Sequence, residues 1–178
     1  LCATLLTPER VVVHNVPQII DVMQLIELLA AMGVEVEHLG GDSYSFRAAD
    51  INLDYLRSED YHRRCRRLRG SVMMIGPLLA RFGVGYIPKP GGDKIGRRRL
   101  DGHFYGLCKL GAVMSGEETY RFDAPAGLSG RELFLDEASV TATEQILIAA
   151  AAARGTTTLY NAACEPHVRD LAELLNAM

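Results

Sequence analysis

Residues 89–104, KPGGDKIGRRRLDGHF, combine two adjacent glycines, an isolated acid and three consecutive arginines. Glycine adopts backbone conformations that are closed to other residues, so this segment can bend sharply or move. Guanidinium groups stay charged and bind phosphate or carboxylate groups in a bidentate manner. An ordinary wide turn beside a solvated arginine face is the simpler interpretation. The chemical alternative is a loop that holds an anion.

Asp93 is the acid at the centre of this segment. Neighbouring arginines should lower its pKa and keep the carboxyl group ionised while the site is empty. A bound anion that takes up the positive field, in a loop closed away from water, would raise that pKa. Asp93 would then be able to donate a proton, as a general acid does. The competing interpretation is a solvated aspartate in a turn.

Other candidate residues precede expected helices. Asp101 suits a helix N-cap, and His103 would lie in the first turn, either touching a ligand or exposed at the surface. Arg69 stands just before a Gly-Ser-Val sequence that should begin a buried helix, and helix N-termini favour anions. The segment with Asp136, Glu137 and Ser139 precedes a second such helix. It is either a ligand-binding terminus or simply a good cap.

These residues would be positioned by a repeated unit of strand, helix, strand pair and helix. Residues 10–33 and 83–111 each predict a strand, a turn and a helix ending in glycine, and residues 156–178 begin a third copy. Residues 34–48 and 112–124 predict hairpins. Helices within residues 69–83 and 137–155 are apolar nearly all round and should be buried. The copies should pack on these shared helices, although a generic α/β domain with accidental similarity is the alternative.

Composition excludes several classes of protein. The 178 residues carry a net charge of −3 and 48% hydrophobic side chains, which suits one sizeable core and not a bulk polyanion binder. A nucleic-acid-binding stripe at Arg63, Arg66 and Arg67 lacks interleaved aromatic residues beyond Tyr61 and overall basicity. The four scattered cysteines predict reduced thiols and no metal site. Neither an apolar run of about 20 residues nor a signal peptide is visible, so we expect a cytoplasmic protein that does not bind membranes.

Taken together, residues 14–33, 68–83, 90–112 and 136–166 resemble the UDP-N-acetylglucosamine 1-carboxyvinyltransferase family across essentially the whole chain. The family makes enolpyruvyl-UDP-N-acetylglucosamine from phosphoenolpyruvate in the first committed step of peptidoglycan synthesis. The resemblance therefore implies a role in cell-wall biogenesis, cell shape and cell division. It implies two substrates, phosphoenolpyruvate and UDP-N-acetylglucosamine, and neither a cofactor nor a metal.

The implied fold is an α/β, inside-out barrel-like domain of repeated βαβαββ units, with helices inside and sheets outside. The family has two such domains with the active site between them. Residues 1–178 would be most of one enolpyruvyltransferase domain, incomplete at both ends, with the second domain absent from this chain. The family's Lys-Asn motif would precede Leu1, and its proton-accepting carboxylate and a further arginine would follow Met178. This fragment alone should therefore be inactive.

The resemblance also implies roles for individual residues. Asp93 would be the proton donor of a mobile loop, Arg98 would bind phosphoenolpyruvate beside the sugar nucleotide, and Glu165 would lie near the reacting centre. Arg69 would contact the uridine nucleotide. The two implied nucleotide-binding segments are Arg98, Arg99, Leu100, Asp101, Gly102 and His103, and Glu137, Ala138, Ser139, Val140 and Thr141.

Three positions depart from the family pattern. Asp93 stands where cysteine is usual, and an aspartic acid can still protonate the methylene carbon of phosphoenolpyruvate. It offers no thiol for alkylation by the epoxide fosfomycin, which implies resistance to that antibiotic. Glu137 stands where lysine is common and Arg99 where proline is common, which bears on the contacts of both segments with the nucleotide.

Two other functions remain open at this stage. A related transferase using shikimate 3-phosphate would share the repeated fold but bind no UDP-sugar. A non-catalytic module that binds anions or nucleic acid through the arginine clusters would show a steep salt dependence without a preference for UDP-sugar.

Overall fold

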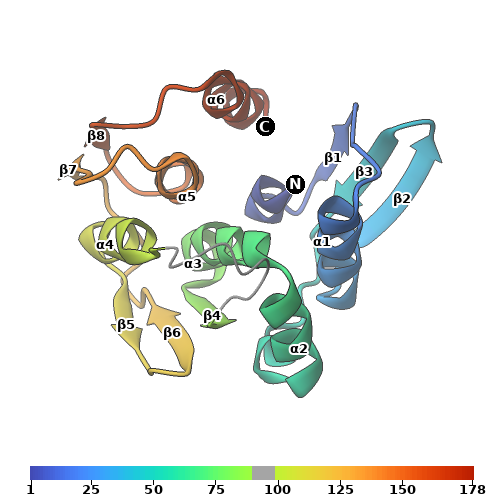
Figure 1. The fold of residues 1–178 in the computed structure, drawn as a ribbon, viewed down its shortest axis with the longest axis horizontal. Coiled ribbons are helices and arrows are strands. Elements are labelled where there is room, and N and C mark those ends of the chain that lie inside the picture. The colour runs from blue at the N-terminus through green and yellow to red at the C-terminus, as the bar shows by residue number, and fades with distance from the viewer. Residues whose placement is uncertain (90–98) are drawn as a thin grey trace.

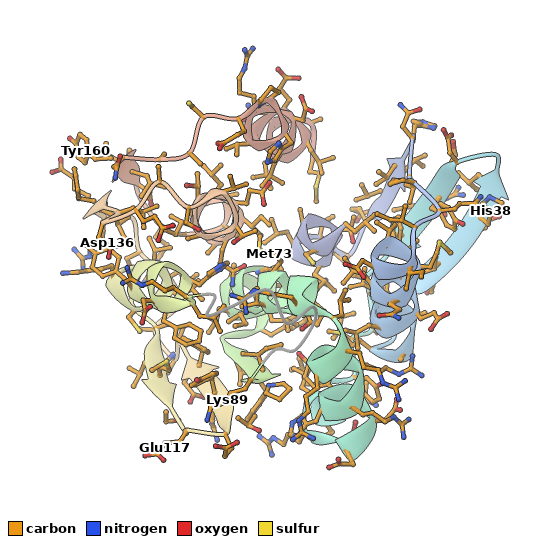
Figure 2. The ribbon with its side chains drawn as sticks, viewed as in Figure 1. His38, Met73, Lys89, Glu117, Asp136 and Tyr160 are labelled. Carbon is orange, nitrogen blue, oxygen red and sulfur yellow. The ribbon has the colours of Figure 1, made fainter. Side chains whose placement is uncertain are left out.

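Three sheet-and-helix units stand around a group of inner helices in the computed structural model, which describes residues 1–89 and 99–178 (Figure 1). The sheets lie toward the periphery: His38, Glu117 and Tyr160 mark their outer parts, whereas Met73 lies near the centre (Figure 2). Buried apolar side chains from the units and the inner helices form one continuous core. This arrangement confirms the expected mixed α/β architecture with helices inside.

The first unit begins with β1 (Arg10–Val13), which is followed by α1 (Ile20–Ala31). The chain then forms a hairpin of β2 (Glu35–Gly40) and β3 (Ser43–Arg47). All pairs are antiparallel, in the order β1-β3-β2, so the last strand of the unit is the central one. The strand, helix and hairpin expected over residues 10–48 are therefore confirmed.

The second unit repeats this topology. Its elements are β4 (Val84–Pro88), α4 (Asp101–Lys109), β5 (Val113–Ser115) and β6 (Thr119–Asp123). The strand order is β4-β6-β5, again antiparallel with the last strand in the centre. The first and second units therefore share one topology, although the connections between their elements differ in length. This confirms the internal repeat.

The third unit is formed by β7 (Glu132–Phe134), α5 (Val140–Ala151), β8 (Thr158–Tyr160) and α6 (Pro166–Ala177). β7 and β8 pair in parallel, and α5 is the crossover helix that connects them. The sequence predicted β8 and α6 but not β7. β7 and β8 both have three residues, but β8 was recognised from its place in the repeat, whereas β7 stands outside the repeat that the sequence showed.

The turns after β1 and β8 also correspond. Asn15 and Asn161 both adopt left-handed backbone angles, with φ of 56° and 54°. Asparagine tolerates this conformation better than most residues, because its short polar side chain can bond to local backbone. The Asn161 side-chain amide also donates a hydrogen bond to the carbonyl oxygen of Leu135, 26 positions earlier in the chain, at 2.9 Å. These turns explain why an asparagine recurs at the corresponding place of the first and third copies.

The inner helices are buried, as expected. α3 (Ile75–Phe82) packs against α5 and against the short 3₁₀-helix η1 (Cys2–Leu6). α3 begins later than predicted, because residues from Arg69 to Met74 form a 3₁₀-helix, η3. Pro77 explains the difference: proline has no N–H donor and is tolerated only in the first turn of an α-helix.

Gly33, at the end of α1, provides a stability test with a matched control. Gly33 and Gly40 have nearly equal φ angles of +103° and +104°. A Cβ atom at Gly33 would overlap the carbonyl oxygen of Asp50, whereas at Gly40 no atom lies within 4 Å. We expect Gly40→Ala to cost about 1–2 kcal/mol from backbone strain. Gly33→Ala should cost roughly 1–3 kcal/mol more from the overlap. Urea unfolding of the full-length protein measures both; equal losses would contradict this packing.

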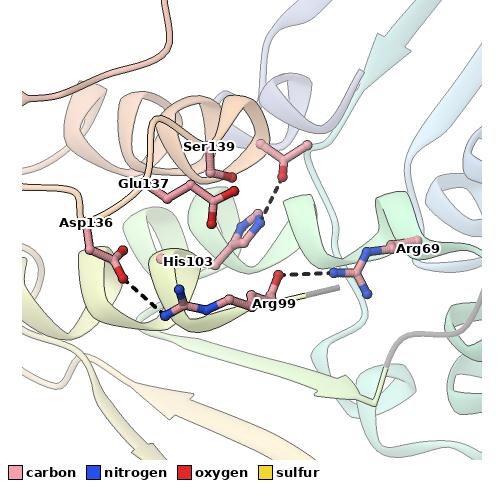
Figure 3. Close-up of a pocket in the computed structure, with 8 residues that line it drawn as sticks. Arg69, Arg99, His103, Asp136, Glu137 and Ser139 are labelled. Atoms are coloured by element: carbon pink, nitrogen blue, oxygen red, sulfur yellow. Dashed lines mark hydrogen bonds and ion pairs between the residues drawn. The ribbon is translucent and has the colours of Figure 1, made fainter. Parts of the chain in front are cut away.

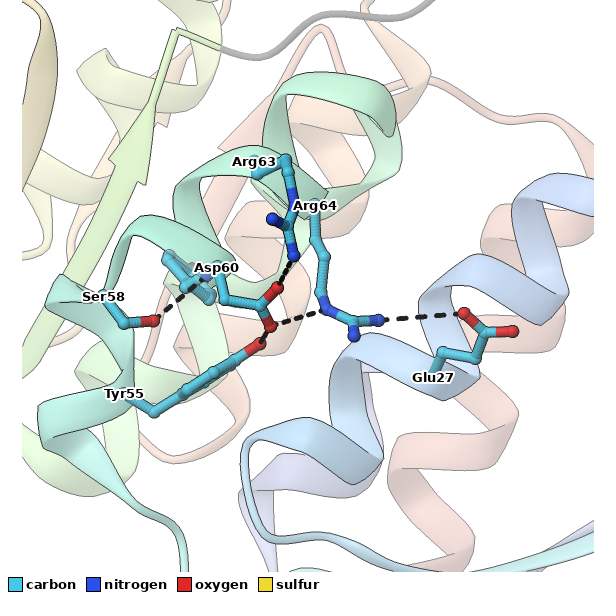
Figure 4. Close-up of polar contacts among 7 residues, drawn as sticks. Glu27, Tyr55, Ser58, Asp60, Arg63 and Arg64 are labelled. Carbon is cyan, nitrogen blue, oxygen red and sulfur yellow. Dashed lines mark hydrogen bonds and ion pairs between the residues drawn. The ribbon is translucent and has the colours of Figure 1, made fainter.

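Helix α2 (Glu59–Arg67) holds the first arginine cluster. Asp60 is its centre: the carboxylate bonds to Arg63, to Arg64 at 2.9 Å and to the Tyr55 hydroxyl at 2.6 Å (Figure 4). The bond from Tyr55, followed by that from Arg64, lowers the pKa of Asp60 to about 2. Several of these arginines therefore serve contacts within the protein, which favours a self-paired surface helix over a nucleic-acid-binding stripe.

Within the described parts of the chain, no helix is both long and apolar enough to span a membrane. Four free thiols are present: Cys2 and Cys65 are buried, and Cys108 and Cys164 are exposed.

Candidate functional site

A cavity of about 370 Å³ opens where three separate chain segments meet (Figure 3). One segment is the start of η3, another is the start of α4, and the last is the cap of α5. Helices α4 and α5 both begin at this pocket, so their free N–H groups favour an anion there. The lining residues are Arg69, Arg99, Gly102, His103, Asp136, Glu137, Ser139 and Thr141.

Arg99 connects all three segments. Its guanidinium donates from Nη2 to Asp136 at 3.1 Å and from Nε to Asp101 at 2.9 Å. Its backbone carbonyl accepts a bond from Nη2 of Arg69 at 3.2 Å. The two carboxylates, Asp101 first, raise the pKa of Arg99 further, so the pocket always contains this cation. Asp101 was a possible helix cap, but its carboxylate bonds to Arg99 and Leu100 is the N-cap, without a side-chain cap bond.

His103 is buried and not at the surface, with only 3% of its area exposed. Its Nε2 lies 3.0 Å from the Thr141 hydroxyl, which joins α4 to α5. Gly106 lets α4 lie close to α5 here, because a Cβ atom at this position would overlap the Ile146 side chain of α5. The other ring nitrogen, Nδ1, is buried and has no hydrogen-bond partner in the described residues. Burial, and then Arg69, lowers the pKa of His103 to about 4, so the ring is neutral at pH 7.

This buried histidine predicts a pH dependence of stability. In the unfolded chain His103 has its ordinary pKa of 6.5, and in the folded protein a pKa of about 4. The unfolded state therefore binds more protons between these values, and stability is lost as pH falls through this window. The loss attributable to His103 should approach about 3 kcal/mol. Urea unfolding at pH 7.5 and pH 4.5 should show this extra loss in the wild type but not in His103→Gln. Equal losses in both proteins would refute it.

The cap of α5 was predicted correctly. Ser139 is the N-cap, and its hydroxyl accepts a bond from the backbone N–H of Ala142 at 3.4 Å. The N–H of Ser139 donates to the carbonyl oxygen of Glu137 at 2.7 Å. This turn places Asp136 and Glu137 at the mouth of the pocket beside the helix N-terminus.

The structure brings together most of the predicted nucleotide-binding residues, and every lining residue except Asp136 was among them. Asp136 was noted only as part of the cap segment, and its bond to Arg99 spans 37 positions that local pattern does not connect. Leu100, Asp101, Ala138 and Val140 adjoin the lining residues without lining the cavity. Glu165 is the N-cap of α6 and does not line it either. Asp93 and Arg98 lie outside the described residues.

The chain matches the family model described as EPSP synthase (3-phosphoshikimate 1-carboxyvinyltransferase) over residues 1–178. Among curated relatives, it is 54% identical to a UDP-N-acetylglucosamine 1-carboxyvinyltransferase of Bacteroides fragilis and 51% identical to one of Porphyromonas gingivalis. Each match covers 100% of this chain and 42% of the relative. The chain therefore spans less than half the length of these relatives.

Solved structures with the same fold are enolpyruvyl transferases. The enolpyruvyl transferase NikO from Streptomyces tendae superposes with a TM-score of 0.76 at 20% identity, covering 98% of this chain and 40% of that one. An EPSP synthase from Acinetobacter baumannii superposes with a TM-score of 0.66 at 16% identity, covering 94% of this chain and 39% of that one.

Proposed function

This chain belongs to the EPSP synthase (3-phosphoshikimate 1-carboxyvinyltransferase) family over residues 1–178, and from that premise we propose a specific transfer reaction. The protein that contains this chain transfers the enolpyruvyl group of phosphoenolpyruvate to the 3′-hydroxyl of UDP-N-acetylglucosamine and releases phosphate. This is the first committed step of peptidoglycan synthesis, which is part of cell-wall biogenesis and takes place in the cytoplasm.

The observation that carries the choice of acceptor is sequence identity along the whole chain. Relatives named UDP-N-acetylglucosamine 1-carboxyvinyltransferase reach 54% identity, whereas the superposed EPSP synthase shares 16%. The described part of the pocket suits a phosphate-bearing acceptor of either kind, because two arginines and two helix N-termini favour phosphate groups. Shikimate 3-phosphate remains the second candidate, since the family model takes its description from that reaction.

The proposed reaction is an addition followed by an elimination. The 3′-hydroxyl oxygen attacks carbon 2 of phosphoenolpyruvate, while Asp93 gives a proton to carbon 3. The hydroxyl proton passes to a carboxylate that lies outside this chain. The tetrahedral intermediate then loses phosphate from carbon 2, and the phosphate takes up the hydroxyl proton. A proton from carbon 3 returns to Asp93, which restores the double bond. Every atom is supplied by the two substrates, and no external oxidant or reductant takes part.

The residues divide into two groups in this proposal. Arg98 balances the negative charge of phosphoenolpyruvate, a role that is typically worth several kcal/mol in comparable electrostatic sites. Glu165 lies near the reacting centre once the active site is complete. Arg69, Arg99 and the residues that line the pocket with them hold the nucleotide.

The test is phosphate release from phosphoenolpyruvate by the full-length protein, with UDP-N-acetylglucosamine or shikimate 3-phosphate as acceptor. We expect turnover with the sugar nucleotide alone, and a product heavier than the acceptor by one enolpyruvyl group in mass spectrometry. Turnover with shikimate 3-phosphate alone would replace the proposed acceptor by the second candidate. If no phosphate is released with either acceptor, a non-catalytic anion-binding module would be the better description.

A further inference from the structure

A separate cavity of about 250 Å³ lies between α1 and α2, and arginines dominate its lining. It is lined by Gln24 and Glu27 from α1 and by Arg63, Arg64 and Arg67 from α2. Figure 1 places α1 and α2 on the other side of α3 from α4, and this cavity shares no lining residue with the pocket at the start of α4. Three cations here face one carboxylate, and the proposed function gives none of these residues a role.

Asp60 holds two of the three arginines in place from outside the cavity. One oxygen of its carboxylate accepts a bond from Arg63, and the other accepts from Nε of Arg64 at 2.9 Å. The Tyr55 hydroxyl donates to the same carboxylate at 2.6 Å. Each guanidinium has further N–H groups that Asp60 does not use. Asp60 therefore orients both cations in advance, which lowers the entropy cost of binding an anion to them.

Arg67 completes the cationic lining. It is exposed, and its guanidinium makes no hydrogen bond or ion pair within the part of the chain that the structure describes. It follows Arg63 by four positions and Arg64 by three, so the three like charges share one helix face and repel one another. The helix dipole favours cations in this last turn but does not require them to line one cavity. Arg66, in the same turn, lies 3.8 Å from Glu59 and does not line the cavity.

Glu27 occupies part of the position that an anion would take. Its Oε2 approaches Nη1 of Arg64 to 3.7 Å across the two helices, which is longer than a hydrogen bond (Figure 4). The Glu27 side chain is 66% exposed. An exposed ion pair of this kind contributes only about 0–1 kcal/mol. A ligand with more negative charge can therefore displace this carboxylate.

We propose that the cavity between α1 and α2 binds a phosphate group through Arg63, Arg64 and Arg67. A phosphomonoester has three free oxygens and a charge of about −1.5 to −2 at pH 7, which suits three guanidinium groups better than a carboxylate does. The cavity is smaller than the roughly 300 Å³ at which pockets for drug-sized ligands begin, so it suits one phosphate group. That group can belong to a free small molecule or to a phosphorylated residue of a partner protein.

The test is modification of arginines in the full-length protein by phenylglyoxal, with the modified positions identified by mass spectrometry. The two probes are inorganic phosphate and a short phosphoserine peptide, each compared with sodium chloride at equal ionic strength. We expect phosphate to slow modification of Arg67 several-fold and to leave Arg66 unchanged. Protection by both probes would show that free phosphate suffices, and protection by the peptide alone would assign a phosphorylated partner. Equal slowing at Arg66 and Arg67, or no slowing at Arg67 by either probe, would overturn the inference.

Three variants test the geometry of the site. Glu27→Gln removes the competing carboxylate and should lower the phosphate concentration that half-protects Arg67 several-fold. Arg63→Ala should raise it about tenfold, the value of one lost hydrogen bond to a charged group. Glu59→Gln is the matched control, because Glu59 is an exposed carboxylate of α2 outside the lining, and it should change nothing. Weaker protection in Glu27→Gln than in the wild type would contradict the site, and the proposed transfer reaction would stand.

Discussion

Replacement of Asp93 by asparagine is expected to slow phosphate release by the full-length protein about a hundred- to ten-thousandfold. Asparagine has nearly the same size, but its amide group has no acidic proton to give to carbon 3 of phosphoenolpyruvate. Substrate binding should be retained, because the arginines and helix N-termini are unchanged. The measurement is phosphate release under saturating substrates, with titration calorimetry to confirm that both substrates still bind.

Asp93→Cys is the companion variant. A thiol at this position should restore proton transfer, and it also offers a nucleophile to the epoxide fosfomycin. We therefore expect the wild type to be unaffected by the drug and Asp93→Cys to be active but inactivated by it. If the Asp93→Asn variant turned over at the wild-type rate, proton donation by Asp93 would be ruled out. Inactivation of the wild type by fosfomycin would place the reactive group elsewhere.

Replacement of Arg69 by alanine should weaken UDP-N-acetylglucosamine about a hundredfold. Arg69 is half-buried, lines the pocket, and donates from Nη2 to the carbonyl oxygen of Arg99 at 3.2 Å. Among the described residues, two cations line the pocket, and the substitution removes one of them together with a bond that orients the start of α4. A hydrogen bond to a charged group is worth about 1.5–3 kcal/mol, and the upper part of this range corresponds to that affinity change.

Arg66→Ala provides the control for this second prediction. Arg66 lies three positions earlier on the exposed surface of α2, where it contacts Glu59 at 3.8 Å and does not line the pocket. Exposed ion pairs contribute little, so its removal should change neither affinity nor stability appreciably. An equal loss in both variants would mean that general positive charge, and not the pocket, attracts the nucleotide.

Much of the fold could be predicted from local sequence signals. α1 ends where Gly33 allows a positive φ, and α4 is followed in the same way by Gly111. Strands with alternating side chains and hairpins with glycine turns repeat in a fixed order. From this order the repeated unit of strand, helix, strand pair and helix could be predicted. The strand β7 escaped prediction because it lies outside the repeat that revealed the equally short β8, and the 3₁₀-helix at Arg69–Met74 was predicted as part of the helix that follows it.

The site was only partly predictable, for a different physical reason. A cap was one of the two interpretations of the segment with Ser139, because capping is local: the hydroxyl accepts from an N–H group three residues later. The burial of His103 depends on how closely α4 approaches α5 at Gly106, which no local pattern states. The pairing of Arg99 with Asp136 likewise depends on two units meeting in space. Roles inferred for Asp93, Arg98 and Glu165 stay predictions.

The most direct test of the central claim is a crystal structure of the full-length protein with UDP-N-acetylglucosamine. The account predicts nucleotide density in the pocket between η3, α4 and the cap of α5, with the Arg69 and Arg99 guanidinium groups within hydrogen-bonding distance of it. Nucleotide density at another place, with the Arg99–Asp136 bond intact and the pocket without nucleotide, would contradict it.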